Sequence, residues 1–167
     1  TDQVYIDHLN GTKSIGMQPC NEEGETKYGI IDIDPKNYIH FDRKFTIDKI
    51  QEYKLPLIPI LSKSGSIHLY IFMKKFVDAA TLKSFLSNLL PLFQLKPDTE
   101  IFPKQTQLTR DLERGGLRPG QFINLPYFNK TDRRALNIDG TEFTFDQFIP
   151  LVESNLVHPD ELNKITE

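Results

Sequence analysis

The chain of 167 residues contains a single cysteine, Cys20, and no run of 18 or more apolar residues. One cysteine excludes an internal disulfide and a cysteine-rich zinc site, and it agrees with a reducing compartment. The lack of a long apolar run and of a signal-peptide pattern predicts a cytoplasmic protein with no membrane partner. The first residue is Thr1 rather than methionine, so the sequence leaves open whether the chain is a fragment.

A large excess of positive charge is also missing, because the formal net charge is −3. This balance argues against a protein that binds nucleic acid through bulk charge. The charges are unevenly placed, however. Residues 1–56 hold ten acids against seven Lys and Arg, whereas residues 101–134 hold seven Lys and Arg against three acids, a local net of +4. An acidic centre beside a basic flank suits a site for metal ions and phosphates, although an ordinary solvated loop explains the basic flank equally well.

Apolar periodicity predicts an α+β domain in which helices pack against a sheet. Strands are expected at 14–19, 27–34, 55–61, 66–74, 99–103 and 121–126, with the first two forming a hairpin or meander. Helices are expected at 46–54 with Thr46 as N-cap, after the N-cap Asp78, and at 144–156. The helix after Asp78 carries an apolar stripe that we assign to core packing: Leu82, Phe85, Leu86, Leu89, Leu90 and Phe93.

Two aspartates end the apolar run in "YGIIDIDPKN", residues 28–37. Asp32 and Asp34 are two residues apart, so on a strand their side chains project from the same face. Neighbouring carboxylates repel one another unless a positive charge lies between them, and Mg²⁺ and Mn²⁺ favour carboxylate oxygens. The pair therefore suggests a cation site. The alternative is a strand end whose acids reach solvent.

A small polar turn precedes the clearest strand in "SKSGSIHLY", residues 62–70. Ser64, Gly65 and Ser66 can offer hydroxyls and backbone N–H groups to an anion, and Lys63 adds a positive charge. Ser66 and His68 share one strand face, so a hydroxyl and an imidazole would meet the same ligand. An ordinary β-turn followed by a hydrogen-bonded sheet histidine is the alternative.

A third acid follows in "EIFPKQ", residues 100–105. Two divalent cations carry roughly four positive charges, and two aspartates do not balance them. Glu100 is the natural third carboxylate, and Asp98 is the second choice. Beyond it lies a polar, basic segment whose cations could hold template phosphates: Lys104, Arg110, Arg114 and Arg118.

Four motifs, "DIDPK", "SKSGSIHLYIF", "EIFPKQ" and "FINLPYF", occur in the order and approximate spacing of the archaeo-eukaryotic primase superfamily. Within it the chain most resembles the primase module of TOTE-type conflict systems and related phage and CRISPR-associated primase-polymerases. "HLNGTKSIGMQP", residues 8–19, resembles the segment that precedes the acid pair. The similarity runs from about residue 2 to residue 155.

The resemblance implies a catalytic domain over residues 1–157, followed by a tail or the start of a linker at 158–167. Its core would be an RRM-like antiparallel sheet that carries the acids, with helices behind it. A preceding β-rich segment would pack beside this core and complete a nucleotide cleft.

The resemblance also implies roles for individual residues. Two Mg²⁺ or Mn²⁺ ions would be held by Asp32, Asp34 and Glu100. The phosphates of the incoming nucleotide would be contacted by Lys63, Ser64, Ser66 and His68. His8 would face the nucleotide or be structural. Arg134 or its neighbour Arg133 would bind the triphosphate or the template. Two departures from the family pattern are Gln18, where an aromatic residue is common, and the long basic insert at 106–120.

The implied function is template-directed nucleotidyl transfer by a DNA/RNA primase-polymerase in a bacterial or phage-infected cell. NTPs or dNTPs would be substrates, single-stranded DNA the template, and a helicase on the same or a partner chain a partner. Two alternatives remain: a metal-dependent nuclease or phosphodiesterase, and a non-catalytic module that binds nucleotides or nucleic acid. The sequence does not distinguish NTPs from dNTPs.

Overall fold

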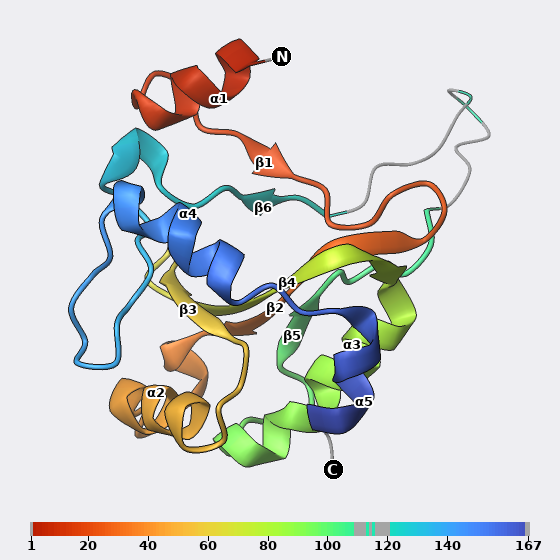
Figure 1. Ribbon diagram of the computed structural model, residues 1–167, viewed down its shortest axis with the longest axis vertical. Coiled ribbons are helices and arrows are strands. Elements are labelled where there is room, and N and C mark those ends of the chain that lie inside the picture. Colours follow the sequence, from red (N-terminus) through yellow and green to blue (C-terminus); the bar gives the residue numbers. More distant parts are fainter. Residues whose placement is uncertain (1, 109–112, 114, 116–120, 166–167) are drawn as a thin grey trace.

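The computed structural model describes residues 2–108, 113, 115 and 121–165. A four-stranded sheet lies at the centre, with helices and a smaller two-stranded sheet around it (Figure 1). In the described part of the chain, no helix combines the length and the apolar character needed to cross a bilayer.

The central sheet is antiparallel, with strand order β3-β4-β2-β5. Its strands are β2 (Glu25–Ile33), β3 (Ile58–Leu61), β4 (Ile67–Asp78) and β5 (Glu100–Phe102). Helix α2 (Arg43–Glu52) connects β2 to β3, and α3 (Ala79–Leu89) connects β4 to β5. The chain therefore follows the order β-α-β-β-α-β, which is the split β-α-β arrangement of RRM-like sheets. This agrees with the α+β class and the RRM-like sheet expected from the sequence.

Helix α3 covers one face of the sheet, together with η2 (Leu90–Phe93). It begins at the expected cap, because the Asp78 carboxylate accepts a hydrogen bond from the backbone N–H of Thr81 at 2.9 Å. All six residues of the apolar stripe are buried. The helix lies so close to β2 that a Cβ added at Gly29 would be 2.7 Å from Leu86 Cδ1. The stripe thus packs against the sheet, as its spacing predicts.

The opposite face of the sheet packs against a second hydrophobic cluster from the C-terminal half of the chain. This cluster draws on β6 (Ile123–Asn124), the segment around η3 (Phe128–Lys130) and α4 (Phe145–Ser154). Strand β2 alternates between the two clusters, with Ile30 in one and Ile31 and Ile33 in the other. Asp32 lies between Ile31 and Ile33 and therefore projects from the face that carries the second cluster.

The N-terminal segment pairs differently from the expected hairpin. Strand β1 (Gly16–Met17) pairs with β6, residue Gly16 opposite Asn124, and not with β2. The reason is that β2 already has β4 and β5 on its two sides, so it offers no free edge. The preceding helix α1 (Asp2–Leu9) was not expected from the sequence and lies beside η3.

Several boundaries also differ from the expectation. Helix α2 begins earlier than residue 46 and is capped by Asp42, while Thr46 is buried inside the helix. Residues 158–165, suggested as a tail or linker, form η4 (Pro159–Glu161) and α5 (Leu162–Ile165). Leu162 is buried in the cluster beneath α3, so this segment adds to the core.

Candidate active site

The first aspartate, the third acid and the histidine lie in one row across the sheet. Asp32 on β2 is directly opposite His68 on β4 and directly opposite Glu100 on β5. Residues that face each other across strands share one face, so these side chains lie on the same side of the sheet. Asp32 Oδ1 is 3.3 Å from His68 Nε2, and both side chains are largely buried. Strand pairing therefore brings together three of the residues singled out from the sequence.

The second aspartate lies just beyond the end of β2. Asp34 caps the short helix η1 (Pro35–Asn37), and its carboxylate accepts a hydrogen bond from the backbone N–H of Lys36 at 3.0 Å. It lines a cavity of about 430 Å³ together with Asp32, Asp98 and Glu100. We call this the acidic cavity. The acid pair, the third acid and the second-choice Asp98 all line it.

The acidic cavity also holds cationic and hydroxyl groups. Lys96 lines it, and its Nζ donates a hydrogen bond to the Asn37 carbonyl at 2.6 Å. Ser64 and Ser66 line the side that faces the β3–β4 turn. Lys96 was not singled out from the sequence, because no local pattern indicates that η1 lies next to it.

The donor set of the acidic cavity fits a hard divalent cation, since carboxylate oxygens predominate. Asp32 Oδ1 is buried and accepts no hydrogen bond, although His68 Nε2 lies 3.3 Å from it. Glu100 is turned towards Lys104, whose Nζ lies 2.8 Å from its Oε1. Among the described residues, no three His, Cys, Asp or Glu side chains are grouped closely enough to hold a metal ion. A cation bound to Glu100 would have to replace Lys104 as the partner of its carboxylate.

The serine-rich turn connects β3 and β4 at the rim of the acidic cavity. Its hydroxyls form a chain, with Ser62 Oγ 3.2 Å from Ser64 Oγ and Ser64 Oγ 3.4 Å from Ser66 Oγ. Gly65 adopts a left-handed conformation with φ of +85°, which a glycine accommodates without strain. The turn is therefore a tight hairpin connection that presents hydroxyls to the cavity.

A second cavity, of about 410 Å³, shares Asp32 with the acidic cavity. It is lined by His68 and the cations Lys63 and Arg133, and we call it the cationic cavity. Asp32 and Ser64 line both cavities. His68 lines the cationic cavity and Ser66 the acidic one, and the shared Asp32 and Ser64 connect the two. That both residues contact one ligand stays a prediction from the strand pattern.

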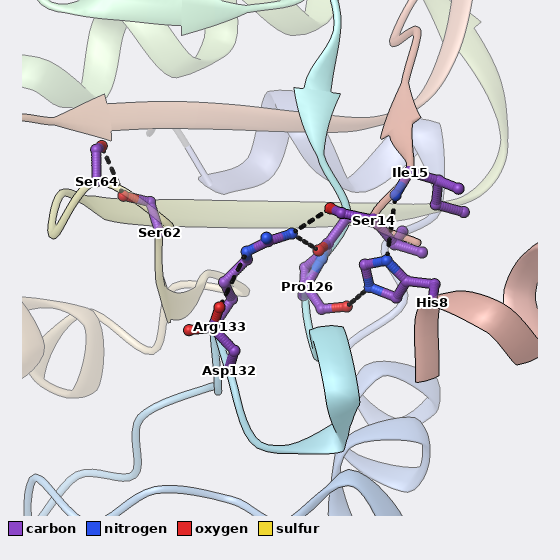
Figure 2. A network of polar contacts seen from close by, with 9 residues as sticks. His8, Ser14, Ile15, Ser62, Ser64, Pro126, Asp132 and Arg133 are labelled. Carbon is purple, nitrogen blue, oxygen red and sulfur yellow. Dashed lines mark hydrogen bonds and ion pairs between the residues drawn. The ribbon is translucent and has the colours of Figure 1, made fainter. Parts of the chain in front are cut away.

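Arg133, rather than Arg134, lines the cationic cavity. Its Nη1 donates hydrogen bonds to Ser14 Oγ at 3.1 Å and to the Leu125 carbonyl at 2.9 Å (Figure 2). Arg134 points elsewhere, with Nη1 3.9 Å from Glu142. Of the two arginines that the sequence left open, the structure places Arg133 at the cavity.

His8 is fully buried and lines neither cavity. Its Nε2 lies 2.8 Å from the Pro126 carbonyl, and its Nδ1 accepts a hydrogen bond from the backbone N–H of Ile15 at 3.3 Å (Figure 2). Both ring nitrogens are thus engaged with the backbone. The structural reading of His8 fits this geometry, whereas contact with a nucleotide does not.

The basic segment is described only at its edges. Arg110, Arg114 and Arg118 lie outside the described residues. Lys104 is described, and its ammonium group is engaged with Glu100 and lies 5.4 Å from the centre of the Phe102 ring. Its role in binding nucleic acid stays a prediction from the sequence.

Two aromatic residues at the cationic cavity were not singled out from the sequence. Phe122 lines the cavity and is 56% exposed, with its Cβ close to Gly16. Tyr70, two residues after His68, also lines the cavity and is almost fully buried. The strand pattern places Tyr70 on the face of His68 but gives no sign that a cavity reaches it.

Comparisons with known proteins identify the family of this chain. Residues 1–165 match the family described as the archaeo-eukaryotic primase domain of the TOTE conflict system. None of the curated proteins matches the chain with significant similarity. The family match spans nearly the entire chain and includes the acid row, the serine turn and the segment that carries Arg133. The chain therefore belongs to the archaeo-eukaryotic primase domain family of TOTE conflict systems.

Proposed function

We propose that this domain is a metal-dependent nucleotidyltransferase that extends a nucleic-acid strand on a template, as a primase-polymerase does. Membership of the primase domain family supports this class of chemistry. The observation that carries the proposal is the position of Asp32 between two cavities, one lined by acids and one by His68, Lys63 and Arg133. An acidic cavity joined to a cationic one suits metal ions and a nucleoside triphosphate side by side.

Asp32, Asp34 and Glu100 would hold Mg²⁺ or Mn²⁺, two ions in the arrangement that we favour. Such ions, when bound, neutralise charge on the reacting phosphate and lower the pKa of the attacking hydroxyl. The chain's own contribution is positioning. His68 and Lys63 would hold the phosphates of the incoming nucleotide, with the hydroxyls of Ser64 and Ser66 beside them.

The substrates in this proposal are NTPs or dNTPs, and the template is single-stranded DNA. The basic segment from Lys104 onwards would contact the template phosphates. A helicase on the same or a partner chain would supply the unwound strand. These partners are inferred from the family resemblance and from the charge of residues 101–134.

A template-directed extension assay tests the proposal. A labelled primer on a longer template is incubated with the protein, with NTPs and dNTPs supplied separately, and with Mg²⁺ or Mn²⁺. We expect the primer to lengthen only when both template and nucleotide are present. Shortening of the labelled strand with Mn²⁺ and no nucleotide would favour a nuclease instead. Nucleotide binding without any change in the strand would favour a non-catalytic binding module.

A further inference from the structure

The inner wall of the cationic cavity carries polar atoms that lack hydrogen-bond partners. In the described part of the chain, five buried side-chain nitrogen and oxygen atoms have none, and three of them belong to residues that line this cavity. These three atoms are Asp32 Oδ1, the Tyr70 hydroxyl and Arg133 Nε. Buried polar groups without partners are costly, so their concentration in one cavity indicates a ligand that satisfies them.

Of these three atoms, the Tyr70 hydroxyl is the one with the fewest polar contacts. Asp32 Oδ1 lies 3.3 Å from His68 Nε2, and Arg133 Nε lies 3.7 Å from Asp132 Oδ2, so each of these two atoms has a polar group close by. The Tyr70 ring is fixed, because it stacks on Phe72 with ring centres 5.3 Å apart and is 1% exposed. The position of its hydroxyl oxygen is therefore fixed.

The Tyr70 hydroxyl is a hydrogen-bond donor under ordinary conditions. Burial raises the pKa of the phenol well above its usual value, and the neighbouring Tyr28 and the negative charge of Asp32 raise it further. Arg133 acts on the same phenol in the opposite direction. The hydroxyl therefore stays protonated. Asp32 and Arg133, which line the same cavity, act on its pKa in opposite directions.

These three groups together select one kind of ligand atom. Tyr70 and Arg133 donate hydrogen bonds, whereas the carboxylate of Asp32 accepts them. A phosphate oxygen accepts but cannot donate, so it cannot satisfy Asp32 Oδ1, whereas the second oxygen of that carboxylate remains for the cation. A hydroxyl group both donates and accepts. The phosphates would remain near Lys63, His68 and the serine turn, where the cavity offers positive charge and hydroxyls.

We propose that Tyr70, with Arg133 beside it, binds a sugar hydroxyl of the incoming nucleotide and thereby makes the domain selective for nucleotides that carry this hydroxyl. The inference rests on the proposed function, because it takes the cationic cavity as the nucleotide site. A ribonucleotide offers a 2′- and a 3′-hydroxyl, and a deoxynucleotide offers only the 3′-hydroxyl. If the 2′-hydroxyl is the one bound, Tyr70 sets a preference for NTPs.

The test measures nucleotide binding by calorimetry, with Mg²⁺ and without template. ATP, dATP and 3′-deoxy-ATP are titrated into the wild-type protein, Tyr70→Phe and the control Tyr28→Phe. Tyr28 is a matched control because its hydroxyl is also buried without a hydrogen bond, yet it lines neither cavity. Tyr70→Phe removes one oxygen that has no hydrogen bond in the protein, so its melting temperature should be equal to or above that of the wild type.

In the wild type, ATP should bind about tenfold more tightly than the analogue that lacks the recognised hydroxyl, which is the loss expected for one hydrogen bond in a buried site. Tyr70→Phe should weaken ATP binding to the level of that analogue and leave the analogue unchanged. Tyr28→Phe should behave as the wild type. The analogue that binds weakly identifies the hydroxyl, 2′ or 3′.

Two results would overturn the inference while leaving the proposed function in place. One is equal affinity of the wild type for all three nucleotides, and the other is a sugar preference that survives in Tyr70→Phe. Failure of the wild type to bind any of the three would overturn the proposed function and this inference together. The two failures are therefore distinguishable in a single set of titrations.

Discussion

Asp32 Oδ1 lies 3.3 Å from His68 Nε2, and the two residues are directly opposite on β2 and β4. This contact joins the acidic cavity to the cationic one, because Asp32 lines both and His68 lines only the second. A change at His68 therefore tests the cationic cavity alone, whereas a change at Asp32 affects both cavities.

Removing the charge of either aspartate should abolish strand extension. Asp32→Asn and Asp34→Asn keep the size of the side chain, and the amide oxygen introduced by the second change can still accept the capping hydrogen bond from Lys36. In metal-free buffer the melting temperature should be unchanged or higher, because repulsion between neighbouring carboxylates is relieved. Extension is measured with a labelled primer, and unfolding by circular dichroism.

Glu153→Gln is a suitable control for the aspartates, since Glu153 is an exposed acid on α4 that lines neither cavity. It should extend the primer as the wild type does. Full extension activity in Asp32→Asn or Asp34→Asn would contradict the assignment of these residues to a metal site.

Loss of the imidazole should weaken nucleotide binding without removing the metal. His68→Ala deletes a side chain that can donate a hydrogen bond to a phosphate, and such a charge-assisted bond contributes about ten- to a hundredfold in affinity. ATP and Mn²⁺ are titrated separately by calorimetry. We expect ATP to bind more weakly and Mn²⁺ to bind nearly as in the wild type.

His40→Ala provides the control for His68, because His40 is exposed and lines neither cavity. If His68→Ala loses Mn²⁺ binding but retains ATP binding, the histidine is a ligand of the cation. The nuclease alternative would then become the better proposal.

The two adjacent arginines should differ in their effect on nucleotide affinity. Arg133→Lys keeps a positive charge but loses the geometry with which the guanidinium contacts Ser14 and Leu125. We expect ATP affinity to fall by about tenfold, together with some loss of stability. Arg134→Lys should leave ATP affinity near that of the wild type, because Arg134 lies outside the cavity. A larger effect at Arg134 would contradict the placement of the nucleotide next to Arg133.

The basic segment should make template binding sensitive to salt. Replacing Arg110, Arg114 and Arg118 with Gln removes up to three phosphate contacts, so the slope of log affinity against log salt should decrease by about 2 on single-stranded DNA. The slope is measured by fluorescence anisotropy. A control changes three cations on α2, Arg43, Lys44 and Lys49, and should keep the slope. An unchanged slope in the first variant would identify the segment as an ordinary solvated loop.

The packing of α3 on β2 should show strong coupling between two residues. Gly29→Ala places a methyl group against Leu86 and should lower the free energy of unfolding by about 1–3 kcal/mol. Leu86→Ala alone should cost about 2–5 kcal/mol because it leaves a cavity. The double variant should cost less than the two changes combined, since the new methyl group occupies part of that cavity. Urea titrations measure all three, and simple additivity would contradict the close contact.

Elements with strong local signals could be predicted from the residues alone. The spacing of Leu82, Phe85 and Leu86 defines one face of a helix, and Asp78 before it supplies the cap. Alternation along residues 28–34 places Asp32 on the opposite face of the strand from Ile31 and Ile33, because successive side chains point to opposite faces. The acids and His68 could be singled out for the same reason, since each lies at the end or start of a recognisable strand.

Contacts between residues that are distant in the sequence became known only from the three-dimensional structure. The partner of β1 depends on β2 being enclosed by β4 and β5, which no local pattern reveals. The choice between Arg133 and Arg134 depends on remote partners, because Arg133 contacts Ser14 and Leu125 whereas Arg134 lies near Glu142. The burial of His8 and the position of Tyr70 at a cavity likewise depend on β6 and Pro126 folding over the sheet. Periodicity reports which face a side chain occupies, but the three-dimensional packing of remote segments determines what that face contacts.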